Sequence, residues 1–400
     1  MTLPPSPGPL PQSLGPELRG LPSQGPLPPG KLPARVHVIG TGLIGTSAAI
    51  ALSQLGVDVT LADASPTSAA LAADLGGGVV RDPDPTEELE VVIVATPPDV
   101  TARVVAQALS RWPSAYVTDV ASVKGAIRGG LVALGVTNGS DGALARYVGG
   151  HPMAGRERSG AIAARSDLFS GRSWVLAVTE ETSREGLALV RGIAEALGSV
   201  VAALSPAEHD AAVAAVSHVP QVTASLVASR LEELPDGAVA LAGQGLRDVT
   251  RIAASDPQLW TQILAGNAGA VAAALRVLAA DLGEVVKALD RLAEPGADHL
   301  GARAVLARAI LHGNAGHDRI PGKHGAAPTT YRTVTVMIPD APGQLGRLFR
   351  DVGEAGVNLE DFHIEHGLGH QFGLLELAVL PAAVGELESA LRVRGWRLLD

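Results

Sequence analysis

The stretch RVHVIGTGLIGTSAAIALSQLG, residues 35–56, constrains the fold of this chain more than any other. It reads as a β-strand, then three glycines at the spacing G-x-G-x-x-G, then an alanine-rich helix. Gly40 permits the tight turn, Gly42 lets the backbone approach a pyrophosphate, and Gly45 lets the helix pack closely on the strand. Such a unit opens a parallel α/β sheet of the Rossmann type, which binds a dinucleotide.

Asp63 strengthens this prediction, because it ends the next expected strand, 21 positions after Gly42. A carboxylate there would hydrogen-bond an adenine ribose 2′-hydroxyl and repel a 2′-phosphate, which favours NAD over NADP. The alternative is a tight turn in another α/β domain, with Asp63 as a helix cap. A proline-stiffened turn after a later strand adds contacts at the same edge. The expected cofactor contacts are Gly40, Gly42, Leu43, Ile44, Gly45, Asp63, Thr96 and Pro97.

The order of strand and helix signals predicts three folded domains. Residues 1–34 hold eleven prolines and are expected to form a disordered tail. Over residues 35–204, β-branched runs alternate with helical stretches, the pattern of parallel βαβ units. An all-helical domain is expected over 205–312 and a polar linker over 313–330. The strands of the first domain are expected at 35–40, 58–63, 91–96, 115–120, 147–151, 173–178 and 199–204.

The last segment, residues 331–400, returns to mixed structure. Its signals read strand, helix, strand, strand, helix, strand, which is the ferredoxin-like βαββαβ order. The expected elements are strand 332–339, helix 345–355, strand 358–366, strand 371–380, helix 382–394 and strand 396–399.

Net charge and cysteine content limit the ligands and the chemistry that the chain can use. The formal net charge is −10, which argues against nucleic acid or an anionic membrane as the main partner. The chain has no cysteine, so it has no disulfide, no thiolate metal site and no cysteine nucleophile. We also find no signal peptide, no apolar run flanked for membrane insertion, and no convincing cluster of metal ligands. We therefore expect a cytoplasmic protein without a metal, whose redox chemistry would need a borrowed cofactor.

His151 stands in GGHPMAG, at the end of the strand expected at 147–151. Parallel strands end at one edge of a sheet, so this histidine and Ser122, which follows an earlier strand, are expected beside the glycine loop. An imidazole there can accept a proton from a substrate hydroxyl while a nicotinamide takes hydride from the same carbon, and a hydroxyl such as that of Ser122 can hold the ring. The alternatives are a structural histidine in a glycine-rich turn and, for Ser122, a helix N-cap.

Six motifs, in chain order, carry a family resemblance: GTGLIGTS, ATPP, DVASVKG, GGHPMAG, SHVP and RDVTRIAASDPQLW. Over about residues 35–311 the chain resembles the prephenate dehydrogenases, a family of tyrosine biosynthesis that includes arogenate dehydrogenases. The resemblance implies NAD-dependent oxidative decarboxylation of prephenate to 4-hydroxyphenylpyruvate. It also implies that His151 contacts the substrate hydroxyl, that Ser122 orients it, and that Arg251 holds a substrate carboxylate.

Further substrate contacts are expected in the helical domain. Arg247 and Arg251 are four positions apart in a helical stretch, hence on one face. His218 lies two residues before Pro220, which cannot donate to the carbonyl of Val216 and must bend or open its helix.

Two positions depart from the family pattern. Gln221 stands where many relatives have a second histidine, and Arg156 where they have threonine. We count both as substrate contacts. An added cation at Arg156 would suit prephenate, with its two carboxylates, better than arogenate, whose side chain carries an ammonium group.

The stretch TVTVMIPDAPGQLGRLFRDVGEAGVNLEDFHIEHG resembles the ACT domain, a small regulatory fold that binds amino acids. In a tyrosine-pathway enzyme the implied effector is tyrosine, and the alternative is a module that only dimerises. The helical domain is apolar on several faces, which favours a homodimer. The expected effector contacts are Asp340, Pro342, Gly343, Gln344, Leu345 and Asn358.

Two other readings compete with a prephenate dehydrogenase, one of another class and one of another enzyme. A non-catalytic amino-acid sensor on a dehydrogenase scaffold would be expected to lose the base or the anchors, yet His151, Ser122 and Arg251 remain. A dehydrogenase of open-chain hydroxyacids usually relies on a lysine in the helical domain. Lys287 is the only lysine there, and it lies far along the helices.

Overall fold

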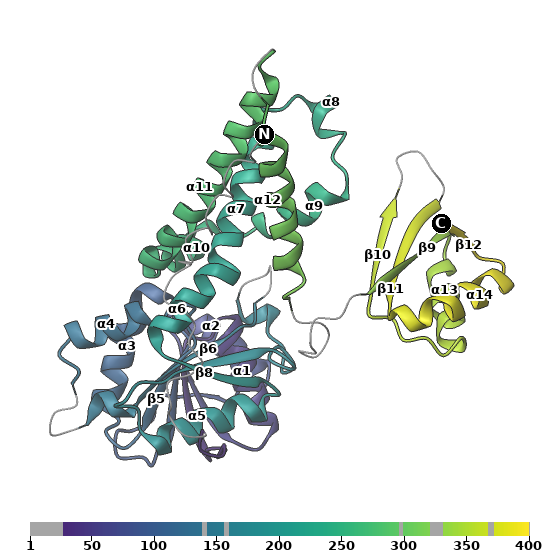
Figure 1. Ribbon diagram of the computed structural model, residues 1–400. Coiled ribbons are helices and arrows are strands. Elements are labelled where there is room, and N and C mark those ends of the chain that lie inside the picture. Colours follow the sequence, from purple (N-terminus) through teal and green to yellow (C-terminus); the bar gives the residue numbers. More distant parts are fainter. Residues whose placement is uncertain are drawn as a thin grey trace. The chain divides into compact units, whose positions relative to one another are not determined.

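The computed structural model describes residues 27–137, 142–155, 160–295, 299–320, 331–366 and 372–399. The chain divides into two compact units, Met1–Ala280 and Asp281–Asp400. Figure 1 follows it from a purple and blue α/β part, through long teal and green helices, to a small yellow domain at the C-terminus. The limits of the predicted tail and domains stay predictions.

An eight-stranded sheet in the order β3-β2-β1-β4-β5-β6-β7-β8 forms the centre of the first unit. The run from β3 to β6 is the doubly wound order of dinucleotide-binding folds, so the predicted Rossmann-type domain is confirmed. Strands β1, β2, β4, β5 and β6 are parallel to their neighbours within this run. The strands are β1 Arg35–Ile39, β2 Asp58–Ala62, β3 Val79–Val80, β4 Val91–Val94, β5 Tyr116–Asp119, β6 Tyr147–Pro152, β7 Ser173–Ala177 and β8 Val200–Leu204.

Helices cover both faces of this sheet (Figure 1). Successive strand residues point to opposite faces, so in β4 Val91 and Ile93 join one hydrophobic core while Val92 and Val94 join the other. All four are fully buried, as is typical of a central parallel strand. The helices between the strands are α1 Leu43–Gln54, α2 Pro66–Asp74, α3 Pro98–Arg111, α4 Gly125–Ala133 and α5 Arg184–Ala196.

One part of the predicted sheet is wrong: β7 pairs with β6 in the antiparallel direction. The described residues between these strands include a single short 3-10 turn, Ala161–Ala163, and no α-helix. A parallel pair needs a long crossover connection, usually a helix, whereas an antiparallel pair does not. The described part of this connection accords with the antiparallel direction.

The segment after the sheet is helical, as predicted. Pro220 opens its helix as expected, because the turn Ala214–His218 is a wider π-helical turn. The stretch Pro206–Glu233 is long and apolar enough to cross a membrane by length and composition alone. Within this stretch the side chains of His209 and His218 are buried. The α-helices are α6 Pro206–Val213, α7 Val219–Ser229, α8 Asp236–Val239, α9 Gln244–Thr250, α10 Pro257–Gly266, α11 Ala268–Ala293 and α12 Ala302–His317.

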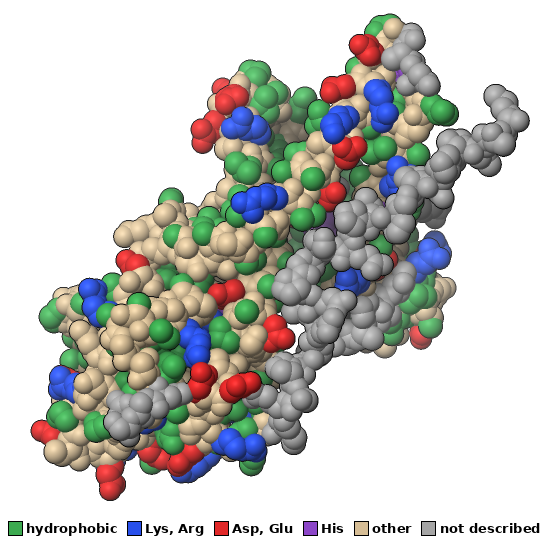
Figure 2. All heavy atoms as spheres, turned by 60° about the vertical axis from the view of Figure 1, so that its left-hand side comes forward, with side chains coloured by type: hydrophobic (Ala, Val, Ile, Leu, Met, Phe, Trp, Pro, Cys, Tyr) green, Lys and Arg blue, Asp and Glu red, His purple; other side chains and the backbone are tan. Residues whose placement is uncertain are grey.

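Helix α12 continues to His317 through two glycines, past residue 313, where the linker was expected to begin. Hydrophobic side chains reach the surface among charged ones over much of the face shown in Figure 2. Along α11 they recur at intervals of three or four positions, which places them on one side of the helix. These exposed side chains are Leu278, Leu282, Val286 and Leu289.

The C-terminal domain has the predicted βαββαβ order, and its four strands pair in the order β10-β11-β9-β12. Every pair is antiparallel, and the helices pack over a core that includes Val336, Leu348 and Leu387. The elements are β9 Arg332–Pro339, α13 Gln344–Glu354, β10 Asp361–His366, β11 Phe372–Val379, α14 Val384–Val393 and β12 Arg397–Leu399.

Candidate active site

The glycine loop follows β1 at the carboxyl edge of the sheet. Gly40 has a φ of 99°, and a Cβ atom there would lie 2.4 Å from the carbonyl oxygen of Ala95. A Cβ atom at Gly45 would lie 1.9 Å from the carbonyl oxygen of Gly40. At Gly42 a Cβ atom would meet nothing within 4 Å. Gly40 and Gly45 are thus required by packing, whereas Gly42 leaves open the space that a pyrophosphate needs at the start of α1.

Asp63 lies against this loop, just after β2. Its Oδ2 accepts hydrogen bonds from the amide of Thr41 at 2.6 Å and the hydroxyl of Thr41 at 3.0 Å, and its Oδ1 accepts from the amide of Ser65 at 2.8 Å. Ser65, not Asp63, is the N-cap of α2, so the alternative reading of Asp63 as the helix cap is wrong. The carboxylate holds the glycine loop at the place expected of a ribose-binding acid.

The other expected cofactor contacts surround the loop. Leu43 is the first residue of α1 and Ile44 packs against the core beneath it. Thr96 and Pro97 follow β4, and their carbonyl oxygens accept hydrogen bonds from the hydroxyl of Thr101 at 3.0 and 2.9 Å. These bonds fix the second turn at the same edge.

His151 lies in β6 with 7% of its surface exposed, at the carboxyl edge that also carries the glycine loop. Its Nδ1 lies 2.8 Å from Nε2 of His209, and Nδ1 of His209 lies 2.8 Å from Oδ1 of Asp210. Both partners belong to α6, and His209 is fully buried. The ring of His151, the candidate base, is therefore held at Nδ1 by His209, which leaves Nε2 as the nitrogen available to a substrate.

Asp210 also joins α6 to α4. Its carboxylate accepts hydrogen bonds from the amides of Lys124 at 2.9 Å and Gly125 at 2.8 Å, the first amides of α4. The reading of Ser122 as the cap of this helix is wrong, since Lys124 is the N-cap residue and Asp210 supplies the acceptor. Ser122 follows β5 at the expected edge and is half-buried, but the ring of His151 is held by His209. The contact of Ser122 with a substrate stays a prediction.

The environment sets the charges of these groups. Burial, reinforced by the neighbouring His209, Lys124 and His218, lowers the pKa of His151 well below its ordinary value, so its ring is neutral at pH 7. Burial alone would raise the pKa of Asp210, but hydrogen bonds from His209 and from the two α4 amides lower it below the ordinary value. A neutral imidazole backed by an ionised carboxylate is suited to general base catalysis.

A buried ion pair lies beneath the base. The ammonium group of Lys124 pairs with Asp119 and donates to the carbonyl oxygen of Gly150 at 2.6 Å, and Tyr147 donates to Asp119 at 2.7 Å. A Cβ atom at Gly150 would lie 2.6 Å from the carbonyl oxygen of Asp119, so the glycine before His151 permits close packing of β6 on β5. This explains the second glycine of GGHPMAG.

The residues of the predicted SHVP motif line the same region. His218 is buried, its Nδ1 lies 3.2 Å from the side-chain nitrogen of Asn267, and its ring meets Trp260 edge to face. Burial lowers the pKa of His218. Gln221 is also buried, and its Oε1 accepts a hydrogen bond from Ser255 at 3.4 Å. His218 and Gln221 are thus fixed by side chains of the RDVTRIAASDPQLW segment and α10–α11.

The expected anion-binding arginines are exposed. Arg247 lies in the last turn of α9 and Arg251 begins the 3-10 turn that follows it. Asp248, which lies between them, accepts a hydrogen bond from Gln244 at 2.8 Å. Arg156 lies outside the described residues.

His209, Asp210 and Asn267 were missed by the sequence analysis. The local signal for the first two is a His-Asp pair in an alanine-rich helix. Asn267 donates to the carbonyl oxygen of Asp210 at 2.7 Å, so it ties α6 to the start of α11.

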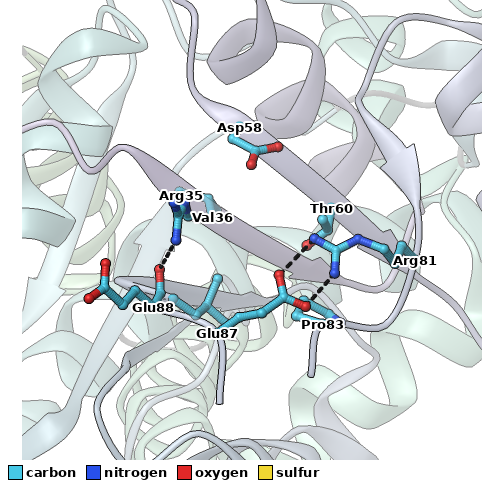
Figure 3. Close-up of a pocket in the computed structure, with 9 residues that line it drawn as sticks. Arg35, Val36, Asp58, Thr60, Arg81, Pro83, Glu87 and Glu88 are labelled. Carbon is cyan, nitrogen blue, oxygen red and sulfur yellow. Dashed lines mark hydrogen bonds and ion pairs between the residues drawn. The ribbon is translucent and has the colours of Figure 1, made fainter. Parts of the chain in front are cut away.

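Figure 3 shows a different, small pocket, at the amino ends of β1 and β2. Arg35 and Asp58 begin these strands, whereas the glycine loop follows the end of β1. Arg81 and Glu87 pair with each other across this pocket. Arg35 donates to the main-chain carbonyl of Glu88 at 3.3 Å. This pocket is separate from the candidate active site.

The expected effector contacts lie around the start of α13. Gly343 has a φ of 85° and is the N-cap residue, so the turn needs a residue tolerant of left-handed backbone. Gln344 and Leu345 open the helix, and Asp340 and Pro342 precede it after β9. The side-chain amide of Asn358 donates a hydrogen bond to the carboxylate of Glu360 at 3.0 Å.

Comparison with known proteins decides the family. Residues 48–203 match the nucleotide-binding domain of prephenate dehydrogenases, and residues 205–298 match their dimerization domain. The chain belongs to the prephenate dehydrogenase family. Together with the glycine loop and Asp63, this membership makes it an NAD-dependent dehydrogenase.

Individual relatives agree with this assignment. The chain is 36% identical over 361 residues to the probable prephenate dehydrogenase NovF of Streptomyces niveus, covering 90% of this chain and 98% of that one. It resembles the crystal structure of Synechocystis arogenate dehydrogenase with a TM-score of 0.58 at 28% identity, covering 71% and 99% of the two chains. It resembles prephenate dehydrogenase from A. aeolicus, in complex with hydroxyphenyl propionate and NAD+, with a TM-score of 0.57 at 29% identity, covering 69% and 98%.

Proposed function

We propose that this enzyme is a prephenate dehydrogenase, which converts prephenate and NAD+ to 4-hydroxyphenylpyruvate, CO₂ and NADH in tyrosine biosynthesis. The observation that carries the proposal is the neutral, buried imidazole of His151, held at Nδ1 and free at Nε2, on the edge of the sheet that carries the glycine loop. That nitrogen accepts the proton of the ring hydroxyl. The glycine loop and Asp63 are the residues that would hold NAD+, which would supply the hydride acceptor for the carbon that bears this hydroxyl.

Loss of the ring carboxylate as CO₂ leaves its electron pair in the ring, which becomes aromatic, and the resulting phenolate oxygen takes the proton back from His151. The chain's own residues therefore need to supply a base and cationic anchors, rather than a nucleophile. We assign the anchors to Arg247 and Arg251, which the structure leaves exposed, and to Arg156. His218 and Gln221 shape the wall beside them, and Ser122 reaches the substrate from the end of β5.

The second candidate is an arogenate dehydrogenase. It is favoured by the likeness to the Synechocystis arogenate dehydrogenase, and by the amide of Gln221, which carries no charge that would repel an ammonium group. The NADH absorbance produced from prephenate with NAD+, then with NADP+, then from arogenate separates the two. We expect the largest kcat/KM with prephenate and NAD+, and a preference for arogenate would overturn the assignment.

We further propose that the C-terminal domain is an ACT domain that binds tyrosine and inhibits the enzyme. The support is its βαββαβ order and the left-handed Gly343, which begins α13 with amides that can bind a carboxylate. We expect tyrosine to lower turnover in the full chain, and Asp340→Ala to weaken that inhibition while turnover without tyrosine stays unchanged. A module that only dimerises would leave turnover insensitive to tyrosine.

A homodimer is the assembly we propose. The segment that matches a dimerization domain includes α11, whose exposed Leu278, Leu282, Val286 and Leu289 form one apolar stripe. We propose a cytoplasmic location as well, on the grounds of composition. Sedimentation of the chain with Leu282→Lys against the unchanged chain tests the stripe, and a dimer that persists undiminished would contradict this interface.

A further inference from the structure

We propose that Asp210 and His209 are positioning residues that set the tautomer of His151, so that its Nε2 carries a lone pair instead of a proton. The inference rests on the proposed role of His151 as the base. It follows from the chain of hydrogen bonds from Asp210 through His209 to His151, and from the number of hydrogens that each side chain can donate.

The first step is fixed by Asp210. Its ionised carboxylate can only accept hydrogen bonds. Oδ2 accepts from the amide of Gly125, and Oδ1 accepts from the amide of Lys124 and from His209. Since no hydrogen lies on the carboxylate, the hydrogen of the 2.8 Å contact with His209 must be carried by Nδ1 of the imidazole.

The second step passes this constraint to His151. In the proposed arrangement His209 carries a single hydrogen, on Nδ1, which leaves a lone pair on its Nε2. The 2.8 Å contact between Nε2 of His209 and Nδ1 of His151 then requires Nδ1 of His151 to donate. A neutral His151 that donates from Nδ1 has its lone pair on Nε2, which is the form that accepts a proton. A doubly protonated His209 would reverse this contact and leave a hydrogen on Nε2 of His151.

The surroundings keep the three groups in this order. His209 is fully buried, so water does not compete for its nitrogens. Both carboxylate oxygens of Asp210 are bonded to amides of α4, and its main-chain carbonyl accepts from Asn267 at 2.7 Å. Rotation of the Asp210 carboxylate would break its hydrogen bonds to the amides of Lys124 and Gly125. The start of α4 therefore helps to fix the position of the hydrogen on His151.

Nuclear magnetic resonance of the full chain with 15N-labelled histidine reads the tautomer without any substrate. The two ring nitrogens give distinct two-bond 15N–1H patterns, and comparison with His151→Gln identifies the signals of His151. We expect the Nδ1–H form of His151 in the unchanged chain. In His209→Gln the amide oxygen lies near the former position of Nε2 of His209 and still accepts, so His151 keeps its Nδ1–H form. In His209→Met the acceptor is lost, so the Nε2–H form of His151 gains population.

Turnover is then compared in the same proteins. His209→Met is expected to lower kcat by roughly 100-fold or more with little change in the KM for prephenate, because the buried His209 acts through His151. His209→Gln is expected to retain more of kcat. An Nε2–H signal from His151 in the unchanged chain, or a wild-type tautomer and kcat in His209→Met, would overturn the proposal. If the unchanged chain turned over neither prephenate nor arogenate, the proposed function would fail, while the spectra would still decide the tautomer.

Discussion

The ammonium group of Lys124 lies 2.6 Å from the carbonyl oxygen of Gly150, the residue directly before His151, and neither side chain of its ion pair with Asp119 is more than 1% exposed. The pair thus ties the end of β5 to the strand that carries the base. Burial lowers the pKa of Lys124, while Asp119 opposes that shift. The positive charge below β6 also contributes to the low pKa of His151.

Replacement of Lys124 by methionine should destabilise the fold. The change removes the donor to Gly150 and leaves the carboxylate of Asp119 buried without its cation, which costs about 3–5 kcal/mol. Urea unfolding measures this loss. Lys287→Met is the matched control, because Lys287 pairs with Glu284 at the surface and its loss should change the free energy of unfolding by less than about 0.5 kcal/mol. Equal stabilities of the two variants would contradict the assigned role of the buried pair.

Valine at Gly42 should block the cofactor and spare the fold. A Cβ atom there meets no protein atom within 4 Å, so the side chain would occupy the space left for the pyrophosphate. We expect thermal stability close to that of the unchanged chain and loss of detectable NAD+ binding by calorimetry. Gly40→Val, in contrast, should unfold the domain, since its φ of 99° and the carbonyl oxygen of Ala95 exclude a side chain. Normal NAD+ affinity in Gly42→Val would show that the dinucleotide binds elsewhere.

Removal of the Arg251 guanidinium should weaken binding of the substrate. Loss of a charge-assisted hydrogen bond to a carboxylate costs about 1.5–3 kcal/mol, so Arg251→Ala should raise the KM for prephenate by roughly 10- to 100-fold. Initial rates at saturating NAD+ give this value. Arg276→Ala, at an exposed position of α11, serves as the control and should leave KM unchanged. The same KM for prephenate in both variants would contradict the assignment of Arg251 as a substrate anchor.

Stability should fall in mild acid partly because of His37. Burial, opposed by the charge of Asp82, lowers the pKa of His37 from 6.5 to about 4 in the folded chain. The unfolded chain therefore binds the proton first as the pH falls, so the contribution of this group is complete above pH 6.5 and is lost toward pH 4. At about 1.4 kcal/mol per pKa unit, the loss is about 3 kcal/mol.

The variant His37→Asn carries no titrating group there, so its free energy of unfolding should depend less on pH between 6.5 and 4. Urea unfolding at several pH values compares it with the unchanged chain and with His312→Asn, whose site on α12 is exposed. An identical pH dependence in His37→Asn and the unchanged chain would mean that His37 is protonated as readily in the folded state as in the unfolded state.

The parts of the fold that were predicted correctly depend on local signals. The glycine spacing after β1, the β-branched run of β4 and the proline at position 220 each constrain the backbone within a few residues. The direction of β7 was missed because it depends on how β6 and β7 are connected in space, and residue composition does not record this.

The candidate site divides in the same way. His151 could be placed at the carboxyl edge, because the ends of parallel strands coincide there. The partners behind it could not be found, since His209 is 58 positions away and Asp210 reaches the amide of Lys124 across 86 positions. Such contacts arise only when α6 packs beside α4. Ser122 was chosen as the partner of the ring because it follows an earlier strand that ends at the same edge of the sheet.

Turnover of prephenate by His151→Asn tests most directly whether this imidazole accepts the substrate proton. Asparagine fills a similar volume but is not a base at neutral pH, so kcat should fall by about 100-fold or more while NAD+ affinity and thermal stability stay near those of the unchanged chain. A folded His151→Asn protein with an unchanged kcat would contradict the assignment of His151 as the base.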